Sequence, residues 1–330
     1  MANYNIKNYR NSILSPFIRD FIRLKKGLGF KAERIETGLW AFDTFAHNKG
    51  NQEIALSKEL VEEWCAKRPN ETVTTWSHRI NYIRQLATYL YNLGYDAYIP
   101  VYHHARRETV VPYIYTDAQL EEIYNATNIL VQQRHHPGYC LFSVPALIRM
   151  LAGTGIRLGE AVNLLDKDVD LGNNCLILRD TKNGRERLVP ISESLSEVCR
   201  QYRQYKSLLP YIHSNTFFVK LNGTKCTNES FGHWWNQILK MAGIPHLGKQ
   251  RGPRIHDLRH SFCVKTMARL AKQGKDLYHI MPILSMYIGH LSLKATDKYV
   301  RLTSEIFPEL LSQTDSICTY ICLLYTSDAA

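Results

Sequence analysis

The chain has 330 residues, of which 45% are hydrophobic and 22% charged, an ordinary composition for a soluble globular protein with room for two domains. It contains no apolar run near the roughly 20 residues of a membrane-spanning helix, and its first residues lack the apolar core of a signal peptide. We therefore expect a cytoplasmic, nucleoid-associated protein with no membrane partner.

The net charge of +11 points to a polyanionic partner. Residues 1–114 hold 16 basic and 11 acidic side chains, and the remainder holds 25 and 19. Basic excess in both parts suits a protein that holds nucleic acid with two domains, although charge alone fits a generic basic protein equally well. The eight cysteines are scattered without a C-x-x-C pair, which predicts reduced thiols and neither a zinc knuckle nor a disulfide framework.

Apolar residues recur at helical spacing in four stretches near the N-terminus, which predicts a bundle of about four helices. These stretches are residues 13–30, 33–47, 57–68 and 72–94. Ser57 is an expected N-cap of the third stretch, and Gly94 closes the fourth. Two prolines and the loss of helical periodicity then predict an interdomain linker. We place the first domain at 1–100 and the linker at 101–114.

The second domain, 115–321, is expected to be mainly helical with one small sheet, so the fold class is mainly α with a small β-sheet (α+β). Helices are predicted at residues 116–127, 140–155 and 156–165. Asn183–Gly184 between two apolar runs, within 175–191, predicts a β-hairpin. Residues 215–219, "NTFFV", are a further possible strand. The last nine residues, 322–330, resemble a translated sequencing adapter and are excluded from the predicted fold.

Four short stretches of the second domain contain residue types suited to cutting a phosphodiester. They are "GTGIRLGE" (153–160), "TKNGRER" (181–187), "HDLRH" (256–260) and "GHLSLKATDKY" (289–299). Two arginines can hold the non-bridging oxygens and neutralise charge in the transition state. A tyrosine hydroxyl can be the nucleophile, a histidine can take its proton, and a lysine at a hairpin tip can protonate the leaving oxygen. The candidate catalytic residues are Arg157, Lys182, His256, Arg259, His290 and Tyr299.

The order of these stretches resembles the phage-integrase family of tyrosine recombinases. That family has a TGxR turn followed by an acidic residue, a hairpin lysine, HxLRH, a GH turn, and a tyrosine nine residues later. The matching residues here are Thr154–Arg157 with Glu160, Lys182, His256–His260, Gly289–His290 and Tyr299. The long stretch between HDLRH and the GH turn resembles a transposase/integrase branch found on mobile elements.

The resemblance implies a helical, SAM-like core-binding domain followed by a tyrosine-recombinase catalytic domain. It implies that Arg157 and Arg259 bind the scissile phosphate, that Tyr299 forms a 3′-phosphotyrosyl bond, and that Lys182 protonates the 5′ oxygen. Lys182 could also be an ordinary hairpin-tip lysine. The covalent bond keeps the phosphodiester energy, so neither ATP nor a metal is expected.

By the same resemblance, His256 assists proton transfer and His290 hydrogen-bonds the phosphate. Glu160 is expected to support the loop of Arg157, and His260 is expected to be a packed residue in a supporting role. Double-stranded DNA is the expected partner, bound by four protomers on two sites, with a monomer or dimer off DNA and possible sister recombinases. Candidate DNA contacts, each of which could instead be a solvated side chain, are Lys25, Lys26, Arg79, Arg84 and Arg185.

Three alternatives stay open at this point. A type IB topoisomerase-like enzyme would share the tyrosine chemistry, and an inactive relative would bind DNA without cleaving it. A zinc hydrolase is the remote third, because His256 and His260 lie four residues apart on a helix. Asp257 stands where such an enzyme has a glutamate, and Arg259 would place a cation beside the metal.

Overall fold

The computed structural model describes residues 12–101, 112–133, 136–179, 184, 186–248, 252–290 and 292–307, with backbone only at 294, 304 and 305. The chain forms two compact units, Met1–Thr109 and Val110–Ala330. Lys182, Arg185 and the terminal segment 322–330 lie outside the described residues. No helix in the described part of the chain is both long and apolar enough to cross a membrane.

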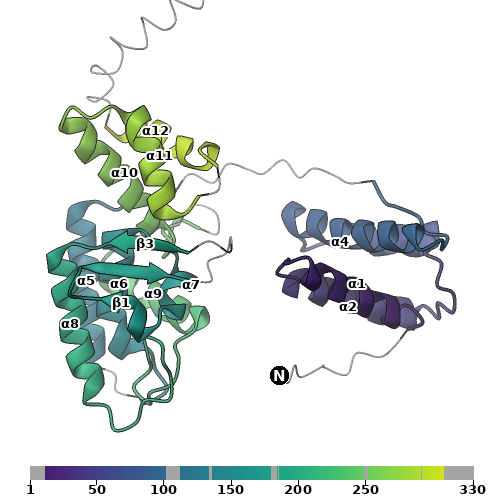
Figure 1. Cartoon of the computed structure of the whole chain (residues 1–330), viewed down its shortest axis with the longest axis horizontal. Helices are drawn as coiled ribbons and strands as arrows, with labels where there is room; N and C mark the ends of the chain where they lie inside the picture. The colour runs from purple at the N-terminus through teal and green to yellow at the C-terminus, as the bar shows by residue number, and fades with distance from the viewer. Residues whose placement is uncertain are drawn as a thin grey trace, which may run out of the picture. The chain divides into compact units, whose positions relative to one another are not determined.

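The first unit contains four helices among its described residues, as the apolar spacing predicts (Figure 1). They are α1 (Ser15–Gly27), α2 (Glu33–Asn48), α3 (Lys58–Cys65) and α4 (Val73–Asn92). The side chains of Ser57 and Thr72 cap α3 and α4 by accepting backbone N–H groups of the first turn. Leu39, Phe42 and Leu86 are fully buried in the core between these helices.

The second unit is mainly helical. Its α-helices are α5 (Asp117–Gln133), α6 (Val144–Thr154), α7 (Leu158–Asn163), α8 (Glu193–Ser207), α9 (Asn228–Met241), α10 (Asp257–Lys272), α11 (Leu277–Ile288) and α12 (Lys294–Ile306). Two short 3₁₀ helices, η1 (Leu141–Ser143) and η2 (Asp166–Asp168), complete the described helical elements. The predicted helix at 156–165 is shorter than expected, because Leu164 already has extended backbone angles.

A three-stranded antiparallel sheet in the order β1-β2-β3 lies within the second unit. The strands are β1 (Val169–Asp170), β2 (Cys175–Leu178) and β3 (Arg187–Pro190). Leu176 pairs with Val189 and both are buried, so the predicted hairpin is confirmed. The strand expected at 215–219 is wrong. Thr216 and Val219 form only isolated bridges, because Phe217 and Phe218 are both buried in the core and leave no alternating pattern.

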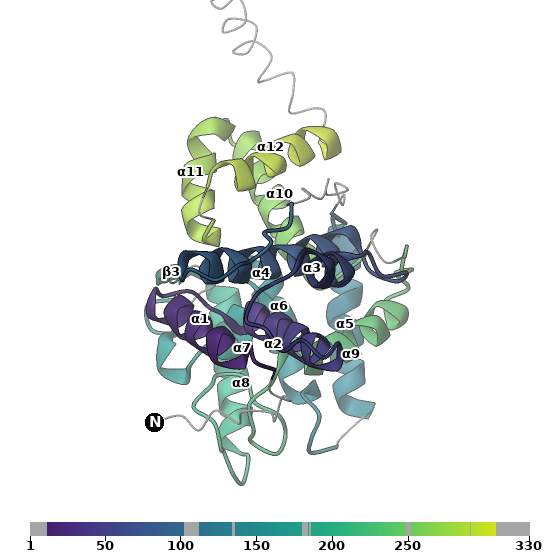
Figure 2. The same cartoon turned by 90° about the vertical axis from the view of Figure 1, so that its right-hand side faces the viewer.

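Helix α10 connects the two cores of the second unit. One side packs on α6 and the other on α12, and Figure 2 shows α10, α11 and α12 lying together. Val264, Met267, Leu284 and Ile288 form the small core between these three helices, and Tyr299 belongs to the same cluster. The start of α10 therefore reaches the C-terminal helices and the turn after α6 at once, and this position creates the candidate site.

Candidate active site

Arg259, in the first turn of α10, joins the segments of the candidate site. Its side chain is 2% exposed, and it donates to the carbonyl oxygens of Gly155 at 2.7 Å and Ile288 at 2.7 Å. Gly155 ends α6 with a left-handed backbone, and Ile288 ends α11. Burial first, and the nearby Arg157 cation second, lower the pKa of Arg259. Arg259 has no ion-pair partner among the described residues, so its charge is available to an anion.

Arg157 precedes α7 and is held by Glu160. The Arg157 backbone N–H donates to Glu160 Oε2 at 2.9 Å, and its Nη1 donates to Glu160 Oε1 at 2.7 Å. Its Nη2 donates to the Gly289 carbonyl at 3.2 Å, which ties α7 to the turn after α11. Burial alone would raise the pKa of Glu160, but hydrogen bonds from Arg187 and from the Arg157 amide outweigh it and lower that pKa. Glu160 therefore carries a negative charge that orients Arg157.

Tyr299 is almost fully buried, at 1% exposure, and its hydroxyl is hydrogen-bonded to His260 Nδ1 at 2.9 Å. Burial, followed by the neighbouring Cys263 thiol, raises the pKa of Tyr299 above its usual value, while Arg259 opposes this rise. Burial, followed by the cation of Lys298, lowers the pKa of His260 to about 2. At neutral pH a neutral imidazole therefore meets a protonated phenol, an arrangement in which the imidazole can accept the hydrogen bond.

The two other predicted histidines lie beside this pair. His256 is the N-cap of α10, and its ring meets the His260 ring edge-on with centroids 5.0 Å apart. It has no hydrogen bond to another side chain in the described part of the chain. The predicted role of His256, to assist proton transfer, therefore has less geometric support than the same role for His260, which is hydrogen-bonded to Tyr299. His290 follows α11; its Nδ1 pairs with Thr296 Oγ1 at 2.9 Å, and its ring stacks at 6.1 Å from that of Tyr299.

Burial, together with Arg259, lowers the pKa values of His256 and His290 to about 4 in each case. All three histidines of the site are therefore neutral near pH 7. Among the predicted catalytic residues that the structure describes, the two arginines are charged and the three imidazoles are not, so mild changes in pH do not alter the charge of this set.

Two residues of the site were missed by the sequence predictions. Lys298 Nζ lies 5.0 Å from the centre of the Tyr299 ring. Arg187 of β3 forms an ion pair with Glu160, with Nη2 2.8 Å from Oε2, and donates from Nε to the Tyr287 carbonyl at 2.9 Å. Its position three residues after Gly184 of the hairpin turn suggests, from the sequence alone, only a solvated or phosphate-contacting side chain.

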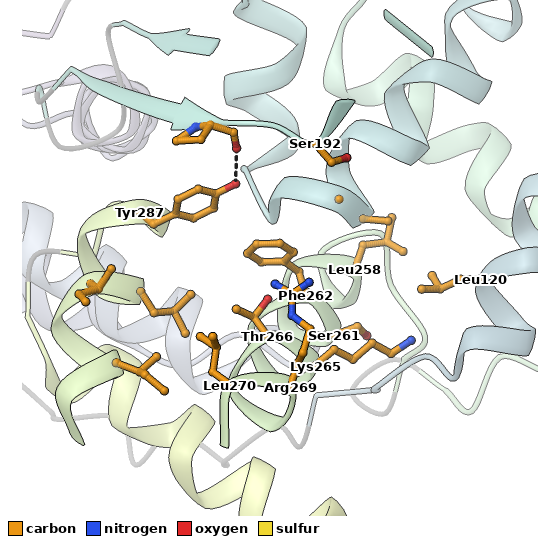
Figure 3. Close-up of a pocket in the computed structure, with 16 residues that line it drawn as sticks. Leu120, Ser192, Leu258, Ser261, Phe262, Lys265, Thr266, Arg269, Leu270 and Tyr287 are labelled. Carbon is orange, nitrogen blue, oxygen red and sulfur yellow. Dashed lines mark hydrogen bonds between the residues drawn. The ribbon is translucent and has the colours of Figure 1, made fainter. Parts of the chain in front are cut away.

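A cavity of about 530 Å³ lies beside α10 (Figure 3). Leu258, Ser261, Phe262 and Lys265 line it and share one face of this helix, and Arg259 is not among the lining residues. Figure 3 shows Tyr287 beside Phe262, with a hydrogen bond from the Tyr287 hydroxyl to the Pro190 carbonyl at 3.1 Å. No predicted catalytic residue that the structure describes lines this cavity, so it is separate from the candidate active site.

The candidate DNA contacts of the first unit differ in their surroundings. The prediction that Arg79 contacts DNA is wrong. Its side chain is only 9% exposed, and its Nη2 is bound to Glu71 Oε2 at 2.6 Å, so it stabilises the unit and is not available to a phosphate. Lys26 pairs with Glu36 at 2.7 Å. Lys25 and Arg84 line the same groove, described below.

Comparison with known proteins finds a match to the description "Phage integrase family" over residues 113–305. An integrase/recombinase of Sinorhizobium fredii, y4rB, is 28% identical over 308 residues, covering 90% of this chain and 96% of the relative. The tyrosine recombinase XerC of Oceanobacillus iheyensis is 27% identical over 311 residues, covering 92% and 87%.

Solved structures share the fold at lower identity. The XerH site-specific recombinase bound to its difH substrate, in a pre-cleavage complex, has a TM-score of 0.58 at 18% identity, covering 87% of this chain and 81% of that chain. The Tn1549 transposon integrase in complex with transposon right-end DNA has a TM-score of 0.57 at 20% identity, covering 88% and 99%. These likenesses extend beyond the matched family region to most of the chain.

Proposed function

Because the chain belongs to the phage integrase family and is a tyrosine-type site-specific DNA recombinase, we propose that Tyr299 is its nucleophile and that Arg157 and Arg259 hold the scissile phosphate. One observation carries this assignment. The buried Tyr299 hydroxyl is hydrogen-bonded to His260 and lies beside the Arg259 guanidinium, which is paired with no carboxylate in the described part of the chain. An arginine held by neutral carbonyls keeps its charge for the phosphate.

In the proposed reaction, the Tyr299 oxygen bonds to phosphorus as the bond from phosphorus to the 5′ oxygen breaks. His260 receives the phenolic proton, and the leaving 5′ oxygen takes a proton from Lys182, which the sequence places in the hairpin after β2. The product is a 3′-phosphotyrosyl ester and a free 5′ hydroxyl. Attack of a 5′ hydroxyl on that ester reverses the step and rejoins DNA, so the exchange consumes no nucleotide.

A shallow groove in the first unit supports double-stranded DNA as the partner. It has a volume of about 300 Å³ and lies between α1 and α4, where Lys25 and Arg84 line it. Its polar lining also includes Asn81, Gln85, Thr88 and Asn92. Lysine and arginine neutralise phosphates, and hydroxyl and amide groups hydrogen-bond both backbone and bases. We infer that this groove contacts duplex DNA.

Solved structures of this fold include a transposon integrase bound to transposon right-end DNA and a site-specific recombinase bound to its difH substrate. The transposon integrase among them supports a role in integrating and excising a mobile element. Exchange of two strands between two duplexes uses four cleavage events, which supports four protomers on two DNA sites. Because the substrate is cellular DNA, we place the protein in the cytoplasm.

The test uses nicked duplexes carrying the DNA that flanks the gene, incubated with protein in EDTA and run on denaturing gels. The wild type should give a covalent protein–DNA band, and Tyr299→Phe should bind the duplex equally well and give none. Tyr278→Phe, on the exposed surface of α11, is the matched control and should behave as the wild type. A covalent band in Tyr299→Phe would show that another residue is the nucleophile. Specific binding by the wild type without any band would favour the inactive DNA-binding alternative.

A further inference from the structure

Three consecutive carbonyl oxygens at the end of α11 each accept a hydrogen bond from a different arginine. Tyr287 O accepts from Arg187 Nε at 2.9 Å. The next two carbonyls, of residues 288 and 289, accept from Arg259 at 2.7 Å and from Arg157 at 3.2 Å. The last carbonyls of a helix have no partner within it and carry the negative end of its dipole, so cations are stabilised there. We call this set of contacts the arginine cap of α11.

We propose that Arg187 is a positioning residue for recombination, which aligns the end of α11 and Glu160 so that Arg157 is held in place for the phosphate. The proposal rests on the function proposed above, because it concerns the same phosphate site. It gives the three arginines different tasks. Arg157 and Arg259 face the DNA, while Arg187 fixes the elements that hold them.

The Arg187 guanidinium is occupied by contacts within the protein, so few of its N–H groups are available to DNA. Its side chain is 11% exposed, and it makes two bonds to Glu160, from Nη1 to Oε1 at 3.2 Å and from Nη2 to Oε2 at 2.8 Å. The same two carboxylate oxygens accept from the Nη1 and backbone N–H of Arg157. Glu160 therefore lies between two guanidinium groups and balances the charge of Arg187. Without Arg187, Glu160 would be free to take both ends of the Arg157 fork and draw it away from a phosphate.

The turn that carries His290 is built around the same guanidinium. Gly289 has a φ of +69°, and a Cβ atom there would lie 2.7 Å from Arg187 Nη1. The guanidinium therefore packs directly on the glycine backbone. A second bond, from the Tyr287 hydroxyl to the Pro190 carbonyl, ties the same end of α11 to the other end of β3 (Figure 3). Strand β3 thus fixes the helix end at two points.

The first measurement compares DNA binding with single-turnover cleavage of the nicked duplex at saturating protein. Arg187→Met should keep the duplex affinity within about twofold and slow cleavage by about 10- to 100-fold, the cost of a catalytic group displaced by about 1 Å. The slope of log affinity against log salt should not change, whereas loss of a phosphate contact would lower it by about 0.9. Arg179→Met, which removes an ion-paired arginine of the same hairpin, is the matched control and should cleave as the wild type.

The second measurement asks whether Arg187 acts through Arg157. The double variant Arg157→Ala/Arg187→Met should cleave no more slowly than Arg157→Ala alone, because a residue that only positions another adds nothing once that residue is gone. A methylphosphonate at the scissile position removes the phosphate charge that Arg157 balances, so it should reduce the defect of Arg187→Met. A 5′-bridging sulfur, which needs no acid to leave, should not reduce it.

Three results would overturn the proposal. The first is that the cleavage defects of Arg157→Ala and Arg187→Met multiply in the double variant. The second is that Arg187→Met lowers the slope of log affinity against log salt by about 0.9, the value of one phosphate contact. The third is that the bridging sulfur fully restores cleavage by Arg187→Met, which would mean that Arg187 acts through the lysine of the hairpin. If Arg187→Met does not fold, Arg187→Lys retains the charge for Glu160 but lacks the planar fork, and the same outcomes apply. Failure of the wild type to cleave would instead contradict the proposed function, so the two failures are distinguishable.

Discussion

A buried phenol and a buried imidazole share one hydrogen bond in the candidate site. Tyr299 is protonated because burial raises its pKa, and His260 is neutral because burial and nearby cations lower its own. Both shifts oppose proton transfer from Tyr299 to His260. A phosphate anion beside His260 would raise the imidazole pKa, so bound DNA itself favours the transfer.

Substitution of His260 should therefore affect chemistry more than binding. His260→Ala is expected to slow single-turnover cleavage by about 100-fold or more, the usual contribution of a positioned base, with duplex affinity unchanged within about twofold. His279→Ala, an exposed histidine of α11, is the control. If His256→Ala loses this activity and His260→Ala retains it, the proton goes to His256 instead.

His260 should also make stability depend on pH. The unfolded chain protonates this histidine below about pH 6.5, whereas the folded protein keeps it neutral to about pH 2, so the stabilisation present above pH 6.5 is lost as pH falls. Between about pH 6 and pH 4 the contribution is about 1.4 kcal/mol per pH unit. Urea unfolding at a series of pH values should show a smaller slope for His260→Gln than for the wild type. Equal slopes would contradict the neutral, buried histidine.

At the scale of the elements, the turn after α11 needs a glycine for two separate reasons. Gly289→Ala should lose about 1 kcal/mol of stability from the left-handed backbone, and its Cβ would also displace Arg187. Gly274→Ala is the matched control, because Gly274 has a φ of +74° and nothing within 4 Å of the added carbon. Thermal unfolding should show a loss for Gly289→Ala at least as large as that for Gly274→Ala, and only Gly289→Ala should lose cleavage. Equal cleavage would show that the arginine cap tolerates the shift.

Which elements could be read from the sequence depends on whether the signal is local. The helices of the first unit and the β2–β3 hairpin follow from apolar spacing, N-caps and the Asn183–Gly184 pair, all of which lie within one element. Strand β1 has only two residues and depends on pairing with β2, so no periodic pattern in the sequence predicts it. Residues 215–219 have strand-like composition, but burial of both phenylalanines and the Lys206 bonds to backbone carbonyls at Thr216 and Phe217 replace sheet pairing.

The same distinction applies to the site. The order of motifs names the six candidate residues, because each motif is continuous in sequence. It does not reveal that His260, rather than His256, meets Tyr299, since both lie at the start of one helix. Nor does it show Arg187, whose partners Glu160 and Tyr287 are 27 and 100 residues away. The catalytic contribution of Lys182 stays a prediction, because that residue lies outside the described part of the chain.

For the whole molecule, the basic excess in both parts of the chain predicts steep salt dependence of DNA binding. Replacing Lys25 and Arg84 together by alanine should lower the slope of log affinity against log salt by about 1 to 2, and weaken binding to all sequences alike. Lys58→Ala, an ion-paired lysine elsewhere in the first unit, should leave the slope unchanged. An unchanged slope in the double variant would remove the groove between α1 and α4 from the DNA interface.

The cap on α11 bears on how such an enzyme avoids stray breaks. Arg157 and Arg259 are both held by carbonyls of neighbouring residues at one helix end. A displacement of that end by a few ångströms would therefore remove one hydrogen bond from each arginine at the same time, leaving Arg157 on Glu160 and Arg259 on the Gly155 carbonyl. We expect cleavage to slow in a protomer whose α11 is out of place, because both charges then lose part of their support. Such a dependence would lower the rate of accidental cutting of a genome.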